Sequence, residues 1–435
     1  NPLTGWVLYA SMGVDAADFW AQYDHMYIPE LGHNVSVTDY AHTLYIRASW
    51  TDFNPQEDVY GWKIDSNLRA YIEGAYQRNM RLAFRVVVDS RDKRTEFTPT
   101  FVRDAGAKGF MNKGKWSPYS DDSVFQKYYT KFVKALAKDF NDPSKVEFID
   151  GFGLGKWGEY HTMIYSTGDD TPKKAVFDWV TDIYSQAFDK VPVVINYHRW
   201  IGAGKDWVDD EHFAADSEEM LEEAIKKGYS LRHDAFGMTT YYGSWERRFA
   251  KKYRNICPII MEGGWIVKSH SYWQDPRGYR KDSHEDVRRG EFDDSKEAHV
   301  NMMDFRFGDT ESWFKDAFDL VRRFLREGGY RLYPSEISLP LEVSKKTTPT
   351  IKHCWNNMGW GYCPTNIPQW NQKYKVAFAL LDSETNEVRY TFVDTNTDLS
   401  KWIKGSPAEY VFEPDMSKVE TGTYVWAVGL VDRSN

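Results

Sequence analysis

Two glutamates stand where short apolar runs end. Glu159 follows the run that opens the segment VEFIDGFGLGKWGEYH, and Glu262 closes the run CPIIME. Cleavage of a glycosidic bond through an oxocarbenium-like transition state needs one carboxylic acid to protonate the leaving oxygen and one carboxylate on the opposite face of the sugar. A strand end gives each side chain a rigid mount. The pair therefore predicts glycosidase chemistry, if the fold brings both carboxyl groups to one pocket.

The segments that must position these glutamates alternate in character. Up to residue 333, short β-rich runs alternate with longer segments of helical period, which is typical of βα units around a parallel sheet. We expect eight strands, at residues 5–9, 43–47, 81–88, 146–151, 193–197, 231–237, 259–262 and 300–305. This pattern predicts an α/β fold, a (β/α)8 TIM barrel over residues 1–333, with its active site at the C-terminal ends of the strands. An open doubly wound sheet is the rival, but no G-x-G-x-x-G or Walker-type loop follows the first strand.

The chain changes character after Tyr333. Prolines recur, and runs that alternate apolar with polar residues appear at 375–381, 388–393 and 423–431. Short alternating runs separated by turn residues indicate antiparallel strands. We therefore predict a C-terminal antiparallel β-sandwich over residues 334–435.

Composition narrows the class of partner. The formal net charge of −9 argues against nucleic acid or an anionic membrane surface as the main partner, because both favour basic proteins. No apolar run approaches the length of a transmembrane helix. Aromatic residues make up 16 % of the chain, with 18 tryptophans, and exposed indole faces suit the apolar faces of sugar rings. A carbohydrate is the partner that these features favour.

The cysteines and histidines predict no metal site. The three cysteines, Cys257, Cys354 and Cys363, are too few for a disulfide framework or a zinc site. One bridge between Cys354 and Cys363 is possible, and three isolated thiols are the favoured interpretation. The histidines near the predicted strand ends lack metal-ligand spacing. We expect neither a metal nor another cofactor.

These features together resemble the retaining glycoside hydrolases of clan A. In that clan a (β/α)8 barrel carries its acid/base glutamate after strand four and its nucleophile glutamate after strand seven, where Glu159 and Glu262 fall in the predicted strand order. Residues 49–65, SWTDFNPQEDVYGWKID, resemble the W-x-x-x-x-P-x-x-G-x-Y-x-W segment of barrel β-galactosidases, with the glycine displaced. Residues 354–362, CWNNMGWGY, and the closing GTYVWAVGLVD are similar to the β-sandwich on many secreted bacterial barrel glycosidases.

The resemblance implies an activity and a place of action. It implies a retaining glycoside hydrolase that acts on β-linked glycans without a cofactor, with Glu159 as general acid/base and Glu262 as nucleophile. It also implies a secreted or periplasmic bacterial protein. A chain that starts at Asn1 rather than Met fits a mature or trimmed protein whose signal peptide, if any, has been removed.

One position departs from the clan A pattern. Gly158 precedes Glu159, whereas most clan A enzymes have an asparagine there that hydrogen-bonds the sugar 2-hydroxyl. That contact must come from elsewhere or be absent. We hypothesise that Asn196 or His198, at the end of strand five, supplies it.

Further candidate binding residues lie at or just after predicted strand ends. Arg47 and Arg85, on strands two and three, are expected to pair with the carboxylates or to contact substrate. The two tyrosines after strand six, Tyr241 and Tyr242, either face the nucleophile, as a tyrosine does in clan A relatives, or pack under a loop. Four tryptophans are candidate stacking platforms, although each alone is more often a core residue: Trp50, Trp157, Trp265 and Trp313.

The connections after the third and the seventh predicted strands are unusually long. Residues 89–120 and 269–295 are expected to form opposite walls of the cleft. Asp150 is interpreted as a structural group inside the barrel.

Two functions rival the glycoside hydrolase. One is a non-catalytic carbohydrate-binding barrel, favoured by the missing asparagine, and the other is a lyase of uronic-acid polymers. The residues set neither the sugar and its linkage nor the oligomeric state.

Overall fold

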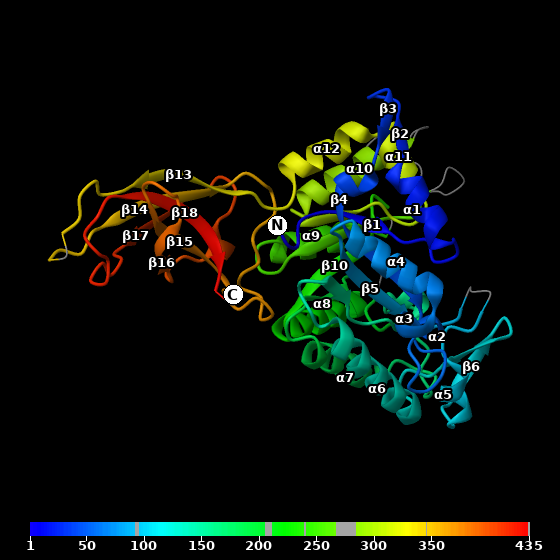
Figure 1. The fold of residues 1–435 in the computed structure, drawn as a ribbon. Helices are drawn as coiled ribbons and strands as arrows, with labels where there is room; N and C mark the ends of the chain where they lie inside the picture. Colours follow the sequence, from blue (N-terminus) through cyan, green and yellow to red (C-terminus); the bar gives the residue numbers. More distant parts are fainter. Residues whose placement is uncertain (92–94, 205–210, 239–240, 267–283, 345, 434–435) are drawn as a thin grey trace.

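A closed barrel of parallel strands forms the first part of the chain (Figure 1). The computed structural model describes residues 1–91, 95–204, 211–238, 241–266, 284–344 and 346–433. The ring closes because the first strand of the barrel pairs in parallel with both the second strand and the last strand. Its strands are β1 (Gly5–Tyr9), β4 (Ala41–Ser49), β5 (Arg81–Val87), β8 (Val146–Asp150), β9 (Val193–Asn196), β10 (Tyr229–Phe236), β11 (Ile259–Gly263) and β12 (Met302–Asp304). Each predicted run overlaps one of these strands, and their ends differ by at most two residues, so the (β/α)8 barrel is confirmed.

Helices cover the outside of this barrel (Figure 1). The longer ones are α1 (Ala16–Asp24), α4 (Ser66–Gln77), α6 (Ser123–Phe140), α7 (Lys173–Ala187), α8 (Glu211–Lys226), α9 (Ser244–Tyr253), α10 (His284–Glu297) and α12 (Phe318–Glu327). Shorter elements are α2 (Trp50–Phe53), α3 (Gly61–Ile64), α5 (Thr100–Asp104), α11 (Thr310–Asp316), the 3-10 turns η1 (Val37–Asp39) and η2 (Lys156–Gly158), and the hairpins β2 (Met26–Ile28) with β3 (His33–Val35) and β6 (Gly109–Asn112) with β7 (Lys115–Pro118). No described helix combines the length and the apolarity that a membrane crossing requires.

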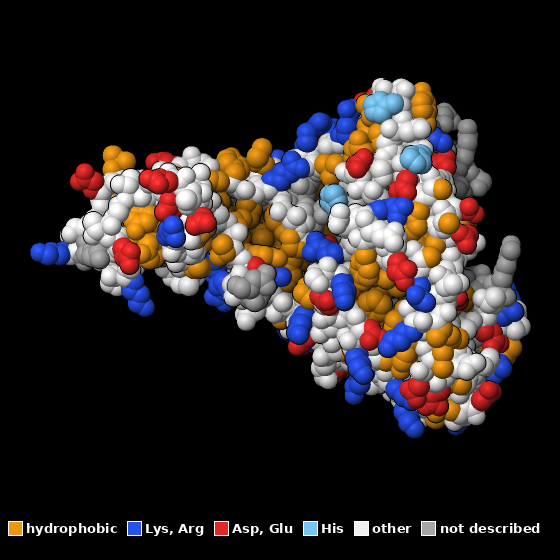
Figure 2. All heavy atoms as spheres, in the orientation of Figure 1, with side chains coloured by type: hydrophobic (Ala, Val, Ile, Leu, Met, Phe, Trp, Pro, Cys, Tyr) orange, Lys and Arg blue, Asp and Glu red, His pale blue; other side chains and the backbone are white. Residues whose placement is uncertain are grey.

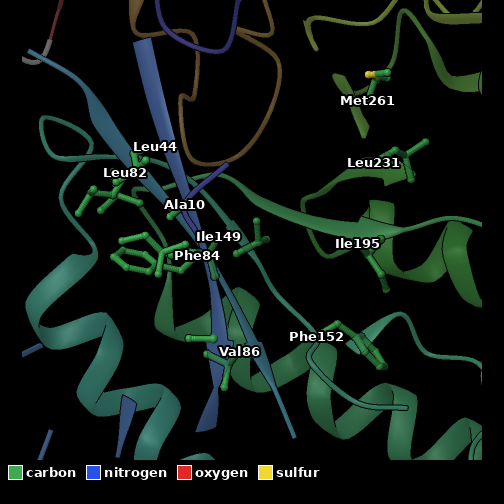
Figure 3. Packing of buried hydrophobic residues seen from close by; sticks show 14 of the residues in the cluster. Ala10, Leu44, Leu82, Phe84, Val86, Ile149, Phe152, Ile195, Leu231 and Met261 are labelled. Atoms are coloured by element: carbon green, nitrogen blue, oxygen red, sulfur yellow. The ribbon is translucent and has the colours of Figure 1, made fainter. Parts of the chain in front are cut away.

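Successive residues of a barrel strand point alternately outward and inward. The outward-facing side chains pack in the cluster beneath the helices, where Leu44, Phe84 and Ile195 lie (Figure 3). Both faces of each strand are therefore buried, which is why the strands read as nearly continuous apolar runs. The inward-facing side chains form an apolar layer across the barrel: Tyr45, Ala83, Phe148, Val194, Ile260 and Met302.

Two antiparallel sheets follow the barrel. One has the order β13 (Leu332–Ser338), β14 (Ile351–Asn357), β17 (Ala408–Phe412), and the other has β16 (Val388–Asp394), β15 (Tyr374–Asp382), β18 (Tyr424–Asp432). The 3-10 turn η4 (Leu399–Lys401) precedes β17. The sheets meet where Phe378 stacks on Phe412, with ring centroids 5.9 Å apart, so the predicted β-sandwich is confirmed. The predicted boundary after residue 333 falls inside β13, and the three cysteines are free thiols, as the favoured interpretation expected.

The β-sandwich closes one end of the barrel. Cys363, Ile367 and Trp370 lie in the same buried cluster as the inward-facing apolar layer. The amide of Asn301 donates to the carbonyl oxygens of Leu3 and Tyr362, at 3.1 and 2.8 Å. Because these contacts lie beneath the N-terminal ends of the strands, access to the barrel interior is from the opposite end. On the face that Figure 2 shows, acidic and basic side chains are interspersed over the barrel.

Candidate active site

A pocket of about 310 Å³ opens at the C-terminal ends of the barrel strands. Both predicted glutamates line it, one from the loop after β8 and one from the end of β11. The strands therefore bring together two carboxyl groups that are far apart in the sequence. Among the described residues, the lining is Arg47, Trp157, Glu159, Asp234, Ala235, Met238, Tyr241, Glu262, Trp265 and Arg306.

A layer of charged side chains lies beneath and around this pocket. Residues two positions apart on a strand share a face, so the residue two places after each inward-facing apolar residue also points into the barrel. At these positions the interior changes from apolar to charged or polar. Tyr45 is followed by Arg47, Ala83 by Arg85, Phe148 by Asp150, Val194 by Asn196, Ile260 by Glu262 and Met302 by Asp304.

Glu159 is buried in the pocket wall, with 6 % of its surface exposed. Its carboxyl group hydrogen-bonds with Asp234, and its Oε2 lies 3.2 Å from His161 Nε2. Its Oε1 lies 3.6 Å from Arg85 Nη1 and 4.0 Å from Arg47 Nη2. Burial and the negative charge of Asp234 raise the pKa of Glu159 to about 8, against the lowering effect of His161. At neutral pH this group therefore carries the proton that a general acid needs.

Asp234 is a third carboxylate in the pocket, and the sequence analysis did not choose it. Its Oδ1 accepts a hydrogen bond of 2.9 Å from Asn196 Nδ2, and its Oδ2 lies 3.3 Å from Arg85 Nη1. The hydrogen bond with Glu159 and the charge of Arg85 hold the pKa of Asp234 well below its usual range, although burial opposes them. One signal existed, since Asp234 stands two residues after Arg232 in the run of β10 and must share its face.

Glu262 is paired with an arginine that the sequence analysis did not choose. The guanidinium of Arg232 forms an ion pair with Glu262, and its Nη2 lies 3.0 Å from Asp304 Oδ2. Arg47 and Arg85, which were expected to pair with the carboxylates or to contact substrate, lie near Glu159 and not in the ion pair of Glu262. Glu262 is 3 % exposed, and the guanidinium of Arg232 places a fixed positive charge beside it.

Asp304 completes the group around Arg232. Burial chiefly raises its pKa to about 8, and the charge of Glu262 raises it further against the lowering effect of Arg232. Asp304 is therefore protonated at neutral pH, and its Oδ1 accepts a hydrogen bond of 2.6 Å from the backbone of Arg306. This leaves Arg232 with one carboxylate to neutralise rather than two.

The four predicted tryptophans divide into two pairs. Trp157 and Trp265 line the pocket, and Trp265 is 55 % exposed, so both can offer an indole face to a ligand. The predictions for Trp50 and Trp313 are wrong. Ser49 caps α2, so Trp50 turns back against α6 and packs on Tyr129 at 5.2 Å. Trp313 is equally buried, in α11 against Trp6 at 5.0 Å.

The two predicted tyrosines also separate. Tyr241 lines the pocket, whereas Tyr242 is buried and points away from it. The hydroxyl groups of Tyr242 and Tyr197 lie 3.0 Å apart, and the Tyr242 ring stacks on Phe236 at 4.3 Å. Tyr242 therefore has the packing role that was the alternative. Tyr9, from β1, is the tyrosine whose pKa, raised to about 12 chiefly by burial, also responds to the charge of Glu262.

The hypothesis for Asn196 and His198 is wrong in its target. Neither residue is part of the pocket lining. The Asn196 amide donates to Asp234, and His198 Nε2 donates to the backbone oxygen of Glu159 at 2.7 Å. His198 Nδ1 accepts from the backbone of Trp200 at 3.1 Å, and burial lowers the pKa of His198, so its ring is neutral. Asn196 therefore holds the Asp234 carboxylate, and His198 holds the backbone of Glu159, from outside the pocket lining.

The expected loop walls are only partly described. The described part of the first loop, residues 95–120, forms α5 and the β6–β7 hairpin and contributes no residue to the pocket lining. Residues 269–283 of the second loop lie outside the described residues, and the chain continues from His284 as α10. Asp150 is a buried structural group, as expected, because it accepts from Arg85 Nε at 2.6 Å and from the Tyr45 hydroxyl at 3.1 Å. In the described part of the chain, no group of three His, Cys, Asp or Glu side chains is arranged to hold a metal ion.

Comparisons with known proteins give weak similarities. No family model matches the chain, and no curated protein matches it. Among solved structures, an endo-glycoceramidase II from Rhodococcus sp. is 12 % identical, with a TM-score of 0.43 over 94 % of this chain and 97 % of that one. An endoxylanase from Clostridium papyrosolvens is 9 % identical, with a TM-score of 0.43 over 99 % and 97 %. An exo-beta-1,4-mannosidase from an Opitutaceae bacterium is 11 % identical, with a TM-score of 0.39 over 70 % and 52 %. At these identities and TM-scores the similarities say nothing about substrate or mechanism.

Proposed function

We propose that this protein is a glycoside hydrolase that cleaves β-glycosidic bonds in a poly- or oligosaccharide with retention of configuration. The observation that carries the proposal is the pair of unlike environments in one pocket. Glu159 is buried and its pKa is raised to about 8, whereas Glu262 is ion-paired with Arg232. An acid that keeps its proton at neutral pH, together with a second carboxyl group held beside a fixed positive charge, is what acid catalysis combined with nucleophilic attack requires.

In the proposed first step, Glu262 attacks the anomeric carbon while Glu159 gives its proton to the leaving oxygen. The bond to the leaving sugar breaks, and a glycosyl ester forms on Glu262. In the second step, the Glu159 carboxylate takes a proton from water as that water attacks the anomeric carbon, and the bond between this carbon and Glu262 breaks. The sugar leaves with its original configuration and both carboxyl groups return to their starting states. Neither step needs a cofactor.

The pocket also supports the proposed substrate class. Trp157, Trp265 and Tyr241 offer aromatic surfaces, and Met238 and Ala235 add apolar area among the charged groups. Aromatic faces beside a few convergent polar groups suit a sugar ring, which has apolar faces and a polar rim. The β-linkage and a secreted or periplasmic bacterial setting rest on the resemblance to clan A and belong to the proposal.

The proposal is tested by hydrolysis of aryl β-glycosides and of β-linked polysaccharides by the wild type, Glu159→Gln and Glu262→Gln. We expect Glu262→Gln to lose activity on both, by on the order of 10³-fold or more, because its attack forms the intermediate. Glu159→Gln should lose most on polysaccharides and less on aryl glycosides with acidic leaving groups, because those need little protonation. Glu73→Gln, an exposed glutamate in α4, is the control and should match the wild type.

Product analysis separates the proposal from its rivals. The β-anomer should be the first product of a β-glycoside when followed by NMR. The α-anomer as first product would overturn retention. Unsaturated products that absorb in the near ultraviolet would identify a lyase. Glycan binding without turnover by the wild type would identify a carbohydrate-binding barrel.

A further inference from the structure

Asp234 is the carboxylate for which the proposed reaction has no role so far. It lines the pocket beside Glu159, on the inward face of β10. A buried carboxylate costs free energy unless its partners compensate it, so its position needs a reason. Three side chains from three other segments converge on it: Asn196 from β9, Arg85 from β5 and Glu159 from the loop after β8.

The partners of Asp234 are themselves fixed. Arg85 Nε donates to Asp150 Oδ2 at 2.6 Å, and Asp150 also accepts from the hydroxyl of Tyr45. Arg85 Nη1 is then directed between the two pocket carboxyl groups, 3.3 Å from Asp234 and 3.6 Å from Glu159. These groups sit on barrel strands, which are the least mobile mounts that the fold offers. Asp234 is therefore held in one position against the Glu159 carboxyl group.

We propose that Asp234 is a positioning residue for the acid of this site: its carboxylate accepts the hydrogen bond of the Glu159 carboxyl group and keeps the proton on Glu159 until a leaving oxygen takes it. This role rests on the proposed function. Once Glu159 has given its proton away, the carboxylates of Glu159 and Asp234 face each other without a hydrogen bond between them. Their repulsion favours the return of a proton from the attacking water, which is the task of Glu159 in the second step.

Other charged and titratable groups face Glu159 from every side. Arg47 on β4 and Arg85 on β5 supply positive charge, and His161 follows Glu159 in its own loop. The rings of His198 and His233 lie behind the pocket, and burial lowers the pKa of both, to about 3 for His233. Glu262 on β11 lines the same pocket, and Asp234 is the acidic group that hydrogen-bonds Glu159.

Asp234 and His161 act on Glu159 in opposite directions. The charge and hydrogen bond of Asp234 raise the pKa of Glu159, and the hydrogen bond and charge of His161 lower it. Replacement of either side chain by a neutral isostere therefore has a predicted sign. Asp234→Asn should let Glu159 ionise at lower pH than in the wild type, and His161→Phe should shift its ionisation to higher pH.

Ionisation of Glu159 can be measured without any substrate. We would follow the carbonyl band of protonated carboxyl groups by infrared spectroscopy from pH 4 to 10 and subtract the spectra of Glu159→Gln at each pH. The midpoint for Glu159 should fall by about one pH unit or more in Asp234→Asn, because a like charge in hydrogen-bond contact shifts a pKa by that amount. Asp150→Asn is the control, since Asp150 binds the same Arg85, and its effect should be smaller.

The ionisation midpoints of the variants test the role of Asp234 directly. A midpoint in Asp234→Asn equal to that of the wild type, or an equal shift in Asp150→Asn, would overturn the role of Asp234. If Asp234→Asn does not fold, an unchanged midpoint in His161→Phe would overturn the account of opposed partners. With an active enzyme, the alkaline limb of kcat/KM should move to lower pH in Asp234→Asn, which a purely structural residue would not cause. Shifted midpoints in a protein that hydrolyses no glycoside would leave the carboxyl pair intact and remove the proposed function.

Discussion

At the scale of single residues, the site is organised around two buried arginines, each held by two acidic side chains. Arg85 stands between Asp150 and Asp234, and Arg232 stands between Glu262 and Asp304. Buried charges are tolerated only in such sets, because each unpaired member would carry its full desolvation cost. The two arginines serve different carboxyl groups of the pocket, so each can be tested alone.

Arg232→Met should both destabilise the protein and disable the site. The substitution keeps an unbranched apolar stem but removes the guanidinium, so the Glu262 carboxylate stays buried without its partner. We expect the free energy of unfolding to fall by roughly 3–5 kcal/mol, as when one member of a buried pair is removed. Urea unfolding measures this loss. Arg69→Met is the control, because Arg69 forms an exposed ion pair with Glu73 and should cost no more than about 0.5 kcal/mol. Equal losses in the two variants would contradict the account.

At the scale of elements, the loop after β8 places Glu159. The backbone of Gly153 has φ +82°, and its carbonyl accepts a hydrogen bond of 3.1 Å from the backbone of Val88, just after β5. A Cβ atom at this glycine would lie 2.3 Å from the carbonyl oxygen of Val86 and 2.6 Å from the Tyr129 hydroxyl. The loop can therefore approach the neighbouring strand only because this residue has no side chain.

Gly153→Ala should cost stability and activity together. The left-handed backbone alone costs about 1–2 kcal/mol for a residue with a Cβ atom, and the close contact adds about 1–3 kcal/mol. The displaced loop would carry Glu159 away from Asp234, so kcat should fall as well. Gly168→Ala is a matched control, because Gly168 has φ +77° with open space at the Cβ position. Gly168→Ala should lose only the part of the free energy of unfolding that comes from the left-handed backbone, and its kcat should equal that of the wild type. A wild-type kcat for Gly153→Ala would refute the positional role of the loop.

The strands were predictable from the sequence, but the partners inside the barrel were not. A strand that is covered on both faces reads as an apolar run with little alternation, so its position is clear and its inward face is not. In β10, Arg232 and Asp234 face inward, and only the closed strand order shows this. Trp50 was misplaced for a related reason, because the helix cap at Ser49 reverses the chain just after the strand. Strand ends thus predict where a site lies, and tertiary contacts decide which side chains enter it.

At the scale of the whole molecule, the β-sandwich and the barrel share one core. Asn301, just before β12, ties the N-terminal segment at Leu3 to the sandwich at Tyr362 through a single buried amide. The indole of Trp360 adds a hydrogen bond of 2.8 Å to the backbone of Val300. Figure 1 shows the sandwich on the side of the barrel where the N-terminus lies. The barrel floor therefore depends on sandwich residues for its packing and for its backbone hydrogen bonds.

Asn301→Ala should destabilise both parts at once. It leaves the carbonyl groups of Leu3 and Tyr362 buried without their donor, at a cost of about 1–3 kcal/mol for each group. Urea unfolding followed by both tryptophan fluorescence and circular dichroism should show one shifted transition. Asn366→Ala is the control, because Asn366 also bridges the two parts, to Ile256, but is exposed, so its loss should stay within about 0.5 kcal/mol. A urea-unfolding midpoint of Asn301→Ala equal to that of the wild type would show that packing at the N-terminal end of the barrel does not depend on this amide.

The position of the β-sandwich beneath the strands has a practical consequence. A bead, an electrode or a cell wall that captured the molecule through its sheets would hold the barrel with its opening turned outward. Large insoluble material could then approach the opening directly, without the anchoring surface in its way.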